Sequence, residues 1–199
     1  MLPFDDIKKY LPQYLSAKST NQLFEDLDAF PENLDKLYSD KVLKEESVFQ
    51  GDGMFELPMI FLPSTEIKNE KGIVLSNTCD INPKNERPIE PRMVYAPLLS
   101  LAKYENLLRS KGVGEKDLSD HVQSIKKQRI SQLIFLPKGQ RLEDDSIALL
   151  DRLNNFVTIQ DQKAIPDLKM FSLSDYGFYV FLIKLSIHFM RIREEYDRN

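Results

Sequence analysis

The chain has 199 residues, of which 42% are hydrophobic and 29% charged, so it is long enough to bury a core without disulfides. Its net charge of −4 disfavours generic binding to nucleic-acid backbones, which depends on basic side chains that neutralise phosphates. Cys79 is the only cysteine, which excludes an internal disulfide, and we expect neither a metal nor a cofactor.

The N-terminal sequence reaches Asp5 and Asp6 at once and has no apolar stretch typical of a signal peptide. The most apolar run, Phe178 to Ile192, is shorter than the roughly 20 residues that a membrane-spanning helix needs. We therefore expect a cytoplasmic protein with no membrane contact.

One domain is predicted over residues 1–199, and it begins with helices over residues 1–45. Apolar residues recur at helical spacing from Phe4 to Leu15, and Ser19 or Thr20 is a suitable cap for a second helix. Pro31 stands where a third, short helix would begin.

Residues 47–160 have short apolar runs separated by glycine and proline, a pattern typical of strands and turns. Helical spacing returns over residues 98–129, where Gly112 and Gly114 separate two helices, so we expect a helical insertion there. The expected strands lie near Gly51, Ile73, Met93 and Leu133, and from Phe156 to Ile159.

A C-terminal helical segment is predicted over residues 171–197, with the helix running from about Asp175 to Tyr196 and Ser172 or Ser174 as its cap. This helix is apolar on nearly all sides, so it has to be covered on several of them. Burial in the protein's own core and docking against a partner or a second copy both remain open. His188 lies within this helix and is expected to be a core or interface histidine.

Four segments of the central region, in order, resemble the small β-barrel of the PemK/MazF family. They are Gly51-Asp52 before alternating apolar residues, GIVLS at 72–76, MVYAP at 93–97, and, over 132–156, a strand, a polar loop and a segment with an Asp before a polar–apolar pair. The sequence Ser-Asn-Thr-Cys-Asp at 76–80 is similar to a motif of an uncharacterised bacterial group with this outline. The resemblance implies an α+β fold with a small SH3-like, PemK-like closed barrel, an inserted helical segment, and N- and C-terminal helices.

PemK/MazF proteins are mainly metal-independent ribonucleases, and their cleavage is thought to use an Arg before the second strand and a Thr or Ser after the third. The corresponding loop here has Lys68 and Lys71 but no Arg, and Ser100 is the nearest hydroxyl after the third strand. Lysine lacks the planar fork with which arginine holds a phosphate. We therefore favour a non-catalytic, barrel-based interaction protein of a bacterial toxin–antitoxin or phage-defence type system. It would bind a protein partner or form a homodimer. The alternative is a metal-independent or divergent endoribonuclease.

Thr78, Cys79 and Asp80, together with Arg92 and Arg129, are the candidate catalytic residues of that alternative. A third hypothesis makes Cys79 a nucleophile or redox sensor near Asp80 and His121. An adjacent acid opposes formation of a thiolate. We therefore favour a Cys79 that is packed as a small apolar residue, with Thr78 and Asp80 hydrogen-bonding the turn.

Basic side chains would form a groove for RNA or DNA if they lay along one side of the barrel. An ordinary charged helix face is the other interpretation, and His121 is expected to be solvated. The acidic run from Glu143 to Asp145 is expected to face solvent rather than bind Mg²⁺. The candidate nucleic-acid-binding residues are Arg87, Arg92, Lys126, Lys127 and Arg129, with Lys138 and Arg141 nearby in sequence.

Overall fold

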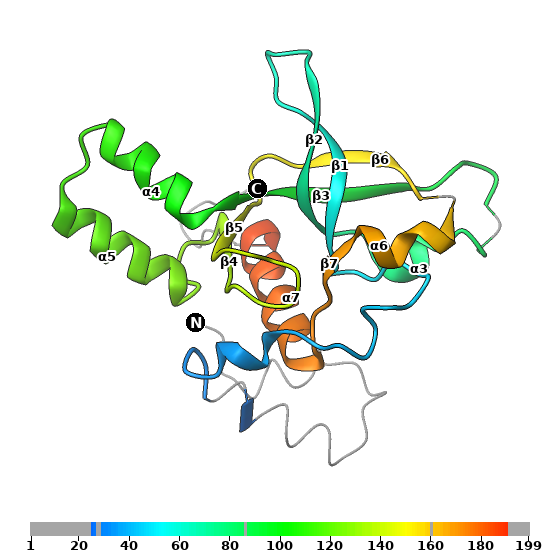
Figure 1. Cartoon of the computed structure of the whole chain (residues 1–199), viewed down its shortest axis with the longest axis horizontal. Helices are drawn as coiled ribbons and strands as arrows, with labels where there is room; N and C mark the ends of the chain where they lie inside the picture. Colours follow the sequence, from blue (N-terminus) through cyan, green and yellow to red (C-terminus); the bar gives the residue numbers. More distant parts are fainter. Residues whose placement is uncertain (1–24, 27–28, 86, 160, 191–199) are drawn as a thin grey trace, which may run out of the picture.

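A computed structural model of the chain describes residues 25–26, 29–85, 87–159 and 161–190. They form an α+β structure around one seven-stranded antiparallel sheet (Figure 1). The main path through the sheet runs β4-β5-β3-β2-β1-β7, and β6 pairs with β3 off this path. The strands are β1 (Gly53–Ile60), β2 (Ile67–Val74), β3 (Arg92–Ser100), β4 (Leu133–Leu136), β5 (Ser146–Leu149), β6 (Asn154–Val157) and β7 (Lys169–Phe171).

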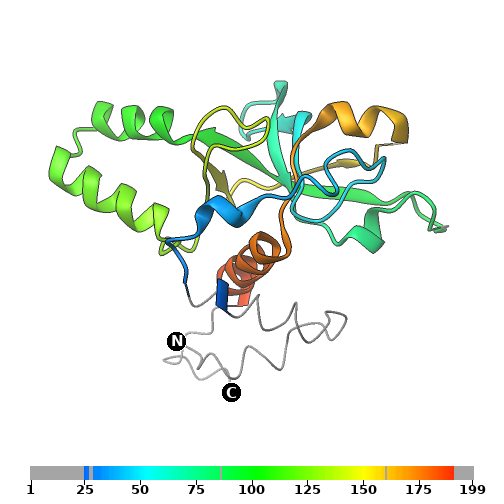
Figure 2. The same cartoon turned by 60° about the horizontal axis from the view of Figure 1, so that its bottom comes forward.

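Helices lie at both ends of the sheet and beneath it (Figures 1 and 2). The α-helices are α3 (Thr78–Ile81), α4 (Leu101–Ser110), α5 (Glu115–Lys126), α6 (Ile165–Leu168) and α7 (Asp175–Met190). Two 3₁₀ helices, η2 (Leu34–Leu37) and η3 (Gln162–Ala164), complete the described elements.

The long strand β3 organises the sheet, because three other strands pair with it. Its residues from Tyr95 to Pro97 pair with β2 on one edge. On the other edge, its first half pairs with β6 and its last three residues pair with β5. β5 and β6 therefore lie end to end along the same edge of β3.

The sheet curls around a core without closing into a barrel. The Tyr95 hydroxyl donates a hydrogen bond to the carbonyl of Pro58, and the Ile60 N–H donates to Asn154 Oδ1 at 2.8 Å, so the end of β1 bends over towards β6. No ladder joins β4 to β7 among the described residues. The turn after β4 spans this gap with a single backbone bond, from Arg141 N–H to the Met170 carbonyl at 3.0 Å. The prediction of a closed sheet is thus wrong. The core under the curled strands contains Met54, Leu57, Met59, Val74, Ile81, Met93 and Tyr95.

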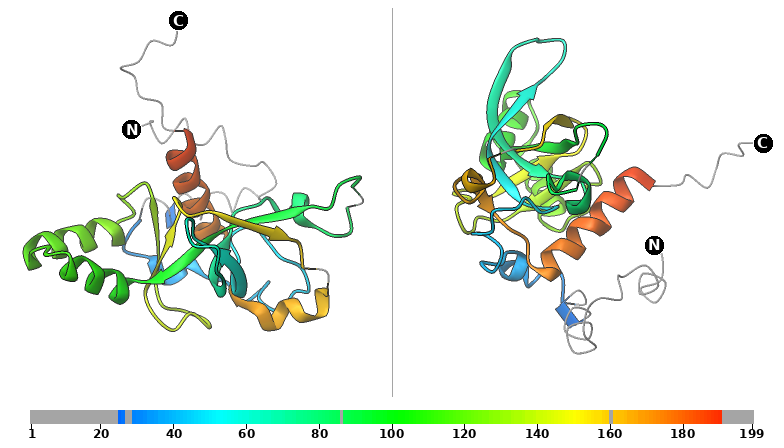
Figure 3. Two further views of the ribbon diagram at one scale, coloured as in Figure 1. Left: turned by 90° about the horizontal axis from the view of Figure 1, so that it is seen from above. Right: turned by 90° about the vertical axis from the view of Figure 1, so that its right-hand side faces the viewer.

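Helix α7 covers a second core on the other side of the sheet (Figures 2 and 3). Gly177 is required where α7 crosses η2, because a Cβ at this position would lie 2.1 Å from the Leu37 carbonyl oxygen. The first turns of α7 are buried, whereas Phe189 and Met190 at its end are exposed. His188 is half-buried, with its ring edge-on to that of Phe189 at 4.7 Å. The helix is therefore covered by the protein's own core over its first half.

The predicted helical insertion forms a hairpin of α4 and α5 that projects from the end of β3 (Figure 1). Helix α4 starts at Leu101, because Leu98 to Ser100 still pair with β5. A third apolar cluster anchors the helical hairpin through Leu101 and Ile125, which pack against β4 and β5.

Several element boundaries differ from the sequence predictions. The strand predicted at 156–159 covers 154–157 instead, and the segments at 146–149 and 169–171 are additional strands. The C-terminal helix begins at Asp175, as predicted, whereas Phe171 at the start of the predicted segment 171–197 belongs to β7. Most of the predicted N-terminal helices, and the end of the C-terminal helix, lie outside the described residues. Within 29–45, the only helix is the single 3₁₀ turn η2.

Candidate functional site

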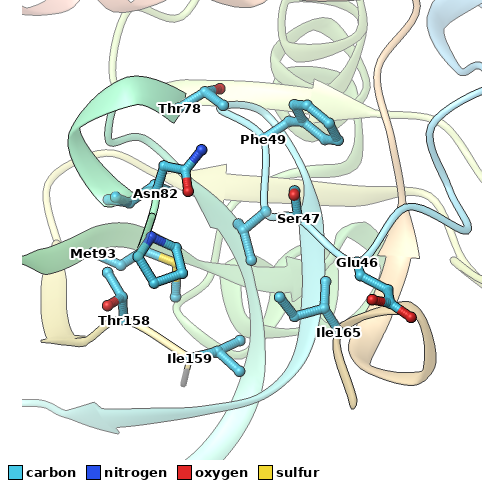
Figure 4. Close-up of a pocket in the computed structure, with 12 residues that line it drawn as sticks. Glu46, Ser47, Phe49, Thr78, Asn82, Met93, Thr158, Ile159 and Ile165 are labelled. Carbon is cyan, nitrogen blue, oxygen red and sulfur yellow. The ribbon is translucent and has the colours of Figure 1, made fainter. Parts of the chain in front are cut away.

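A cavity of about 80 Å³ lies at the end of the core that the curled strands enclose; we call it the α3 pocket. It is bounded by α3, the segment 46–49, the residues after β6 and the start of α6 (Figure 4). Apolar side chains make up much of its wall, including Val48, Ile81, Met93 and Ile165. Ser47, Thr78, Asn82 and Thr158 add polar groups to the lining.

The Ser76–Asp80 motif leads into the single helical turn α3 and contributes Thr78 to the pocket lining. Asn77 caps α3, because its side-chain oxygen accepts from the Cys79 N–H at 2.9 Å. The Thr78 hydroxyl accepts from the Gln50 N–H at 2.9 Å, and Ser76 Oγ accepts from the Val94 N–H at 2.8 Å. These hydrogen bonds connect the turn to the segment before β1 and to β3, so the polar side chains of the motif stabilise the fold.

Cys79 is exposed, and its predicted packing as a small apolar residue is wrong. The turn of α3 places Ile81 in the core and leaves Cys79 on the outside. The Asp80 carboxylate pairs with Arg87 at 3.0 Å rather than with the turn backbone, and Arg87 also donates to the Cys79 carbonyl. Thr78, Cys79, Asp80 and Arg87 therefore lie together beside the pocket.

His121 is not near Cys79, as the thiol hypothesis required. It lies on α5, half-buried rather than solvated, and its Nε2 is 3.0 Å from the Tyr104 hydroxyl of α4. This contact joins the two helices of the insertion, which project from the opposite end of β3 from α3 (Figure 1). The structure gives Cys79 no histidine base among the described residues.

The basic residues predicted to bind nucleic acid fall into two separate groups. Arg92 begins β3, where its Nε donates to Asn155 Oδ1 at 2.6 Å, and Arg87 lies near α3. Lys126 ends α5, where it pairs with Asp145 at 3.2 Å, and Lys127 and Arg129 follow it. The nine residues of β3 separate the groups by about 25 Å at the spacing of an extended strand. Asp80, Arg92 and Arg129 therefore do not converge on one cleft.

The remaining charged candidates are engaged in local contacts. One guanidinium nitrogen of Arg141 donates to three backbone carbonyls at the end of α6, those of Pro166, Asp167 and Lys169. Asp145 accepts from the Lys138 N–H at 3.0 Å, in addition to its pair with Lys126. In the part of the chain that the structure describes, no three His, Cys, Asp or Glu side chains are grouped as a metal ion would need.

A buried ion pair behind the pocket wall was not found by sequence reasoning. The Lys169 ammonium lies 3.1 Å from Asp52 Oδ2 and 4.7 Å from the ring centre of Phe49, which lines the pocket. Asp52 also accepts from the Phe49 N–H and the Ser172 hydroxyl, and Lys169 donates to the Val42 carbonyl. Burial raises the pKa of Asp52 and lowers the pKa of Lys169, although each partner acts in the opposite direction.

Only one residue of this ion pair, Asp52, had a recognisable signal in the sequence. Asp52 belongs to the Gly-Asp sequence of the family resemblance, and Gly51 before it has a φ of 90°, which favours glycine. Lys169 stands between Leu168 and Met170, and nothing in its local sequence distinguishes it from a surface lysine. No family model matches the chain, and no curated protein matches it. None of the described helices combines the length and the apolar character of a membrane span.

Proposed function

We propose that this chain is a non-catalytic interaction protein built on an opened small barrel of the PemK/MazF kind. We assign it to a bacterial toxin–antitoxin or phage-defence type system. This proposal is supported by the hydrogen bonds and the ion pair that already engage the polar side chains around the α3 pocket. The side chains of Ser76, Asn77 and Thr78 accept bonds from backbone N–H groups, and Asp80 is paired with Arg87. Groups held in this way are poorly placed to exchange protons with a substrate.

The pocket itself favours a partner side chain over a nucleotide. Pockets that hold drug-sized ligands have volumes of about 300–1,000 Å³, several times that of the α3 pocket. An apolar wall with a few polar groups is typical of the place where one anchoring side chain of a protein partner is inserted. The partner we propose is therefore a protein segment with an exposed aliphatic residue, and the pocket is the place where it anchors.

The α3 pocket is tested by filling it. Ser47→Trp would place an indole in the opening from the half-buried segment before β1, whereas Lys116→Trp adds the same group on the exposed face of α5. We expect tagged wild type and Lys116→Trp to retain the same protein partner in pull-downs from native cells. Ser47→Trp should retain at least about tenfold less, which is the loss of one anchor residue. Equal recovery with all three chains would contradict the role of the pocket.

A divergent endoribonuclease is the second candidate, because Thr78, Asp80, Arg87 and Arg92 lie at the same end of β3. Purified protein incubated with total RNA and with plasmid DNA, with and without Mg²⁺, separates the two proposals. We expect both nucleic acids to stay intact in gel electrophoresis. Cleavage of RNA that is lost in Arg92→Ala but kept in Lys126→Ala would overturn the non-catalytic function and assign the activity to this end of the strand.

A further inference from the structure

The hairpin of β1 and β2 projects beyond the rest of the sheet (Figures 1 and 3). β2 pairs with β3 only from Gly72 to Val74, whereas its pairing with β1 continues outward to Ile67. The five residues Ile67–Lys71 therefore have a strand on one side only among the described residues; we call them the β2 edge. The side chains of its first four residues are exposed.

The register shows which peptide groups of the β2 edge point outward. On β1, the carbonyl of Pro58 accepts from Tyr95 and the N–H of Ile60 donates to Asn154, so both residues face away from β2. Asn69 and Ile67, which stand opposite them, must then turn their own N–H and C=O groups away from β1. Lys71 also turns its N–H and C=O groups away from β1, because this orientation repeats at every second residue of a strand. The β2 edge thus presents three residues whose backbone groups are ready to pair with another strand.

The charges on the β2 edge complement a second copy of the same edge. Lys68 and Glu70 flank Asn69 on either side. If two edges pair antiparallel around a two-fold axis at Asn69, Lys68 of each copy stands opposite Glu70 of the other. Because Asn69 faces Asn69 as a hydrogen-bonded pair, these charged residues occupy the positions where opposing side chains come closest. Charged edges normally prevent self-pairing through like-charge contacts, and here the contacts are of opposite sign.

We propose that the β2 edge binds a second copy of this chain. The two hairpins pair antiparallel from Ile67 to Lys71, so that the two sheets join across a two-fold axis. A second copy fits better than an unrelated extended peptide, because the chain itself carries the complementary charges at the spacing that antiparallel pairing around Asn69 requires. This surface lies on the projecting hairpin, apart from the α3 pocket, so the failure of either proposal leaves the other standing.

Charge exchange tests the register. In sedimentation equilibrium, we expect wild type to show a dimer mass that decreases on dilution. Lys68→Glu and Glu70→Lys should each dissociate at least about tenfold more readily, since each places two like-charge pairs in the dimer. The double variant K68E/E70K should regain the wild-type affinity. An equimolar mixture of the two single variants should form heterodimers, because both charge pairs are then complementary. Both residues are exposed, so the fold should be unchanged by circular dichroism.

A backbone substitution separates strand pairing from side-chain contact. Asn69→Pro removes an outward N–H while leaving the ladder to β1 intact, since Asn69 does not donate to β1. We expect it to abolish the dimer, whereas Asn69→Ala should associate within about twofold of wild type. A wild-type chain that stays monomeric at all concentrations overturns the proposal. So do single charge variants that fail to associate with each other, and a dimer that persists in Asn69→Pro. Binding of an extended peptide to an edge that remains monomeric would also overturn it.

Discussion

Two sets of charged side chains in this protein lie in opposite environments. Asp52 and Lys169 are fully buried beside β1 and β7, and Lys184 on α7 is 4% exposed. On the projecting hairpin, Lys68 and Glu70 face water. The buried charges each have two or more hydrogen-bond partners, whereas Lys68 has a single ion pair with its neighbour Glu66. The buried charged groups hold neighbouring segments of the chain in place, whereas the charged side chains of the hairpin are accessible to another chain.

The buried pair should give the largest effect if this comparison is right. Asp52→Ala leaves the Lys169 ammonium in the core without its counter-ion and removes the acceptor for Ser172 and the Phe49 N–H. We expect the free energy of unfolding to fall by about 3–5 kcal/mol. The measurement is urea denaturation followed by circular dichroism, because the chain has no tryptophan.

The double variant D52A/K169M sharpens this test. Removing both charges eliminates the buried ammonium, so it should be more stable than Asp52→Ala alone despite the larger change. Lys116→Met serves as the control for removing an exposed lysine and should stay within about 0.5 kcal/mol of wild type. If the loss in D52A/K169M equals the sum of the losses in Asp52→Ala and in Lys169→Met, Asp52 and Lys169 do not depend on each other.

Local patterns were sufficient for the elements that a continuous apolar run marks in the sequence. The run from Leu133 to Leu136 is a buried strand and the apolar segment from Asp175 is a helix, as expected. The three-residue strand β7 had no such signal, because it is too short for alternation and begins with a lysine. That lysine is buried through contacts with Asp52 and Val42, which lie more than a hundred residues earlier in the chain. No local pattern encodes partners so distant.

The candidate site was predicted in part for the same reason. The Ser76–Asp80 motif was expected at the end of a strand and does form a capped turn there, because Asn77 accepts from the Cys79 N–H two residues later. Thr78 was predicted to bond the backbone of the turn, but it accepts instead from the N–H of Gln50 in a distant segment. The grouping of basic residues was wrong, because it depended on the path of β3 between Arg92 and the helical insertion. The closed sheet was wrong because β7 and β4 are linked by the 139–142 turn rather than by a ladder.

One hairpin provides a second comparison within itself, of smaller effect. Leu57 on β1 is 4% exposed and packs in the core under the curled strands, whereas Leu62 at the tip is 79% exposed. We expect Leu57→Ala to lower the free energy of unfolding by about 2–5 kcal/mol, through lost burial and a cavity. The same change at Leu62 should cost less than about 0.5 kcal/mol. Similar losses in urea denaturation at both positions would mean that the tip is as well packed as the base.

The last expected effect is a pH dependence that comes from Lys184. Its ammonium donates to the carbonyls of Gln128 and Ile130 at 2.8 and 2.7 Å, and burial lowers its pKa from 10.5 to about 8. Below pH 8 the amine is protonated in both the folded and unfolded chain, so it adds no slope. Between pH 8 and 10.5 only the unfolded chain holds the proton, so this group makes stability rise with pH.

Substitution isolates this contribution from the other lysines and tyrosines that titrate in the same range. The stability of wild type minus that of Lys184→Met, measured by urea denaturation from pH 7 to 10.5, should be flat up to about pH 8 and then increase. The slope should approach one proton released by folding. A flat difference for Lys184 would mean that its amine has the same pKa in the folded and the unfolded chain, so that burial does not disfavour its charge.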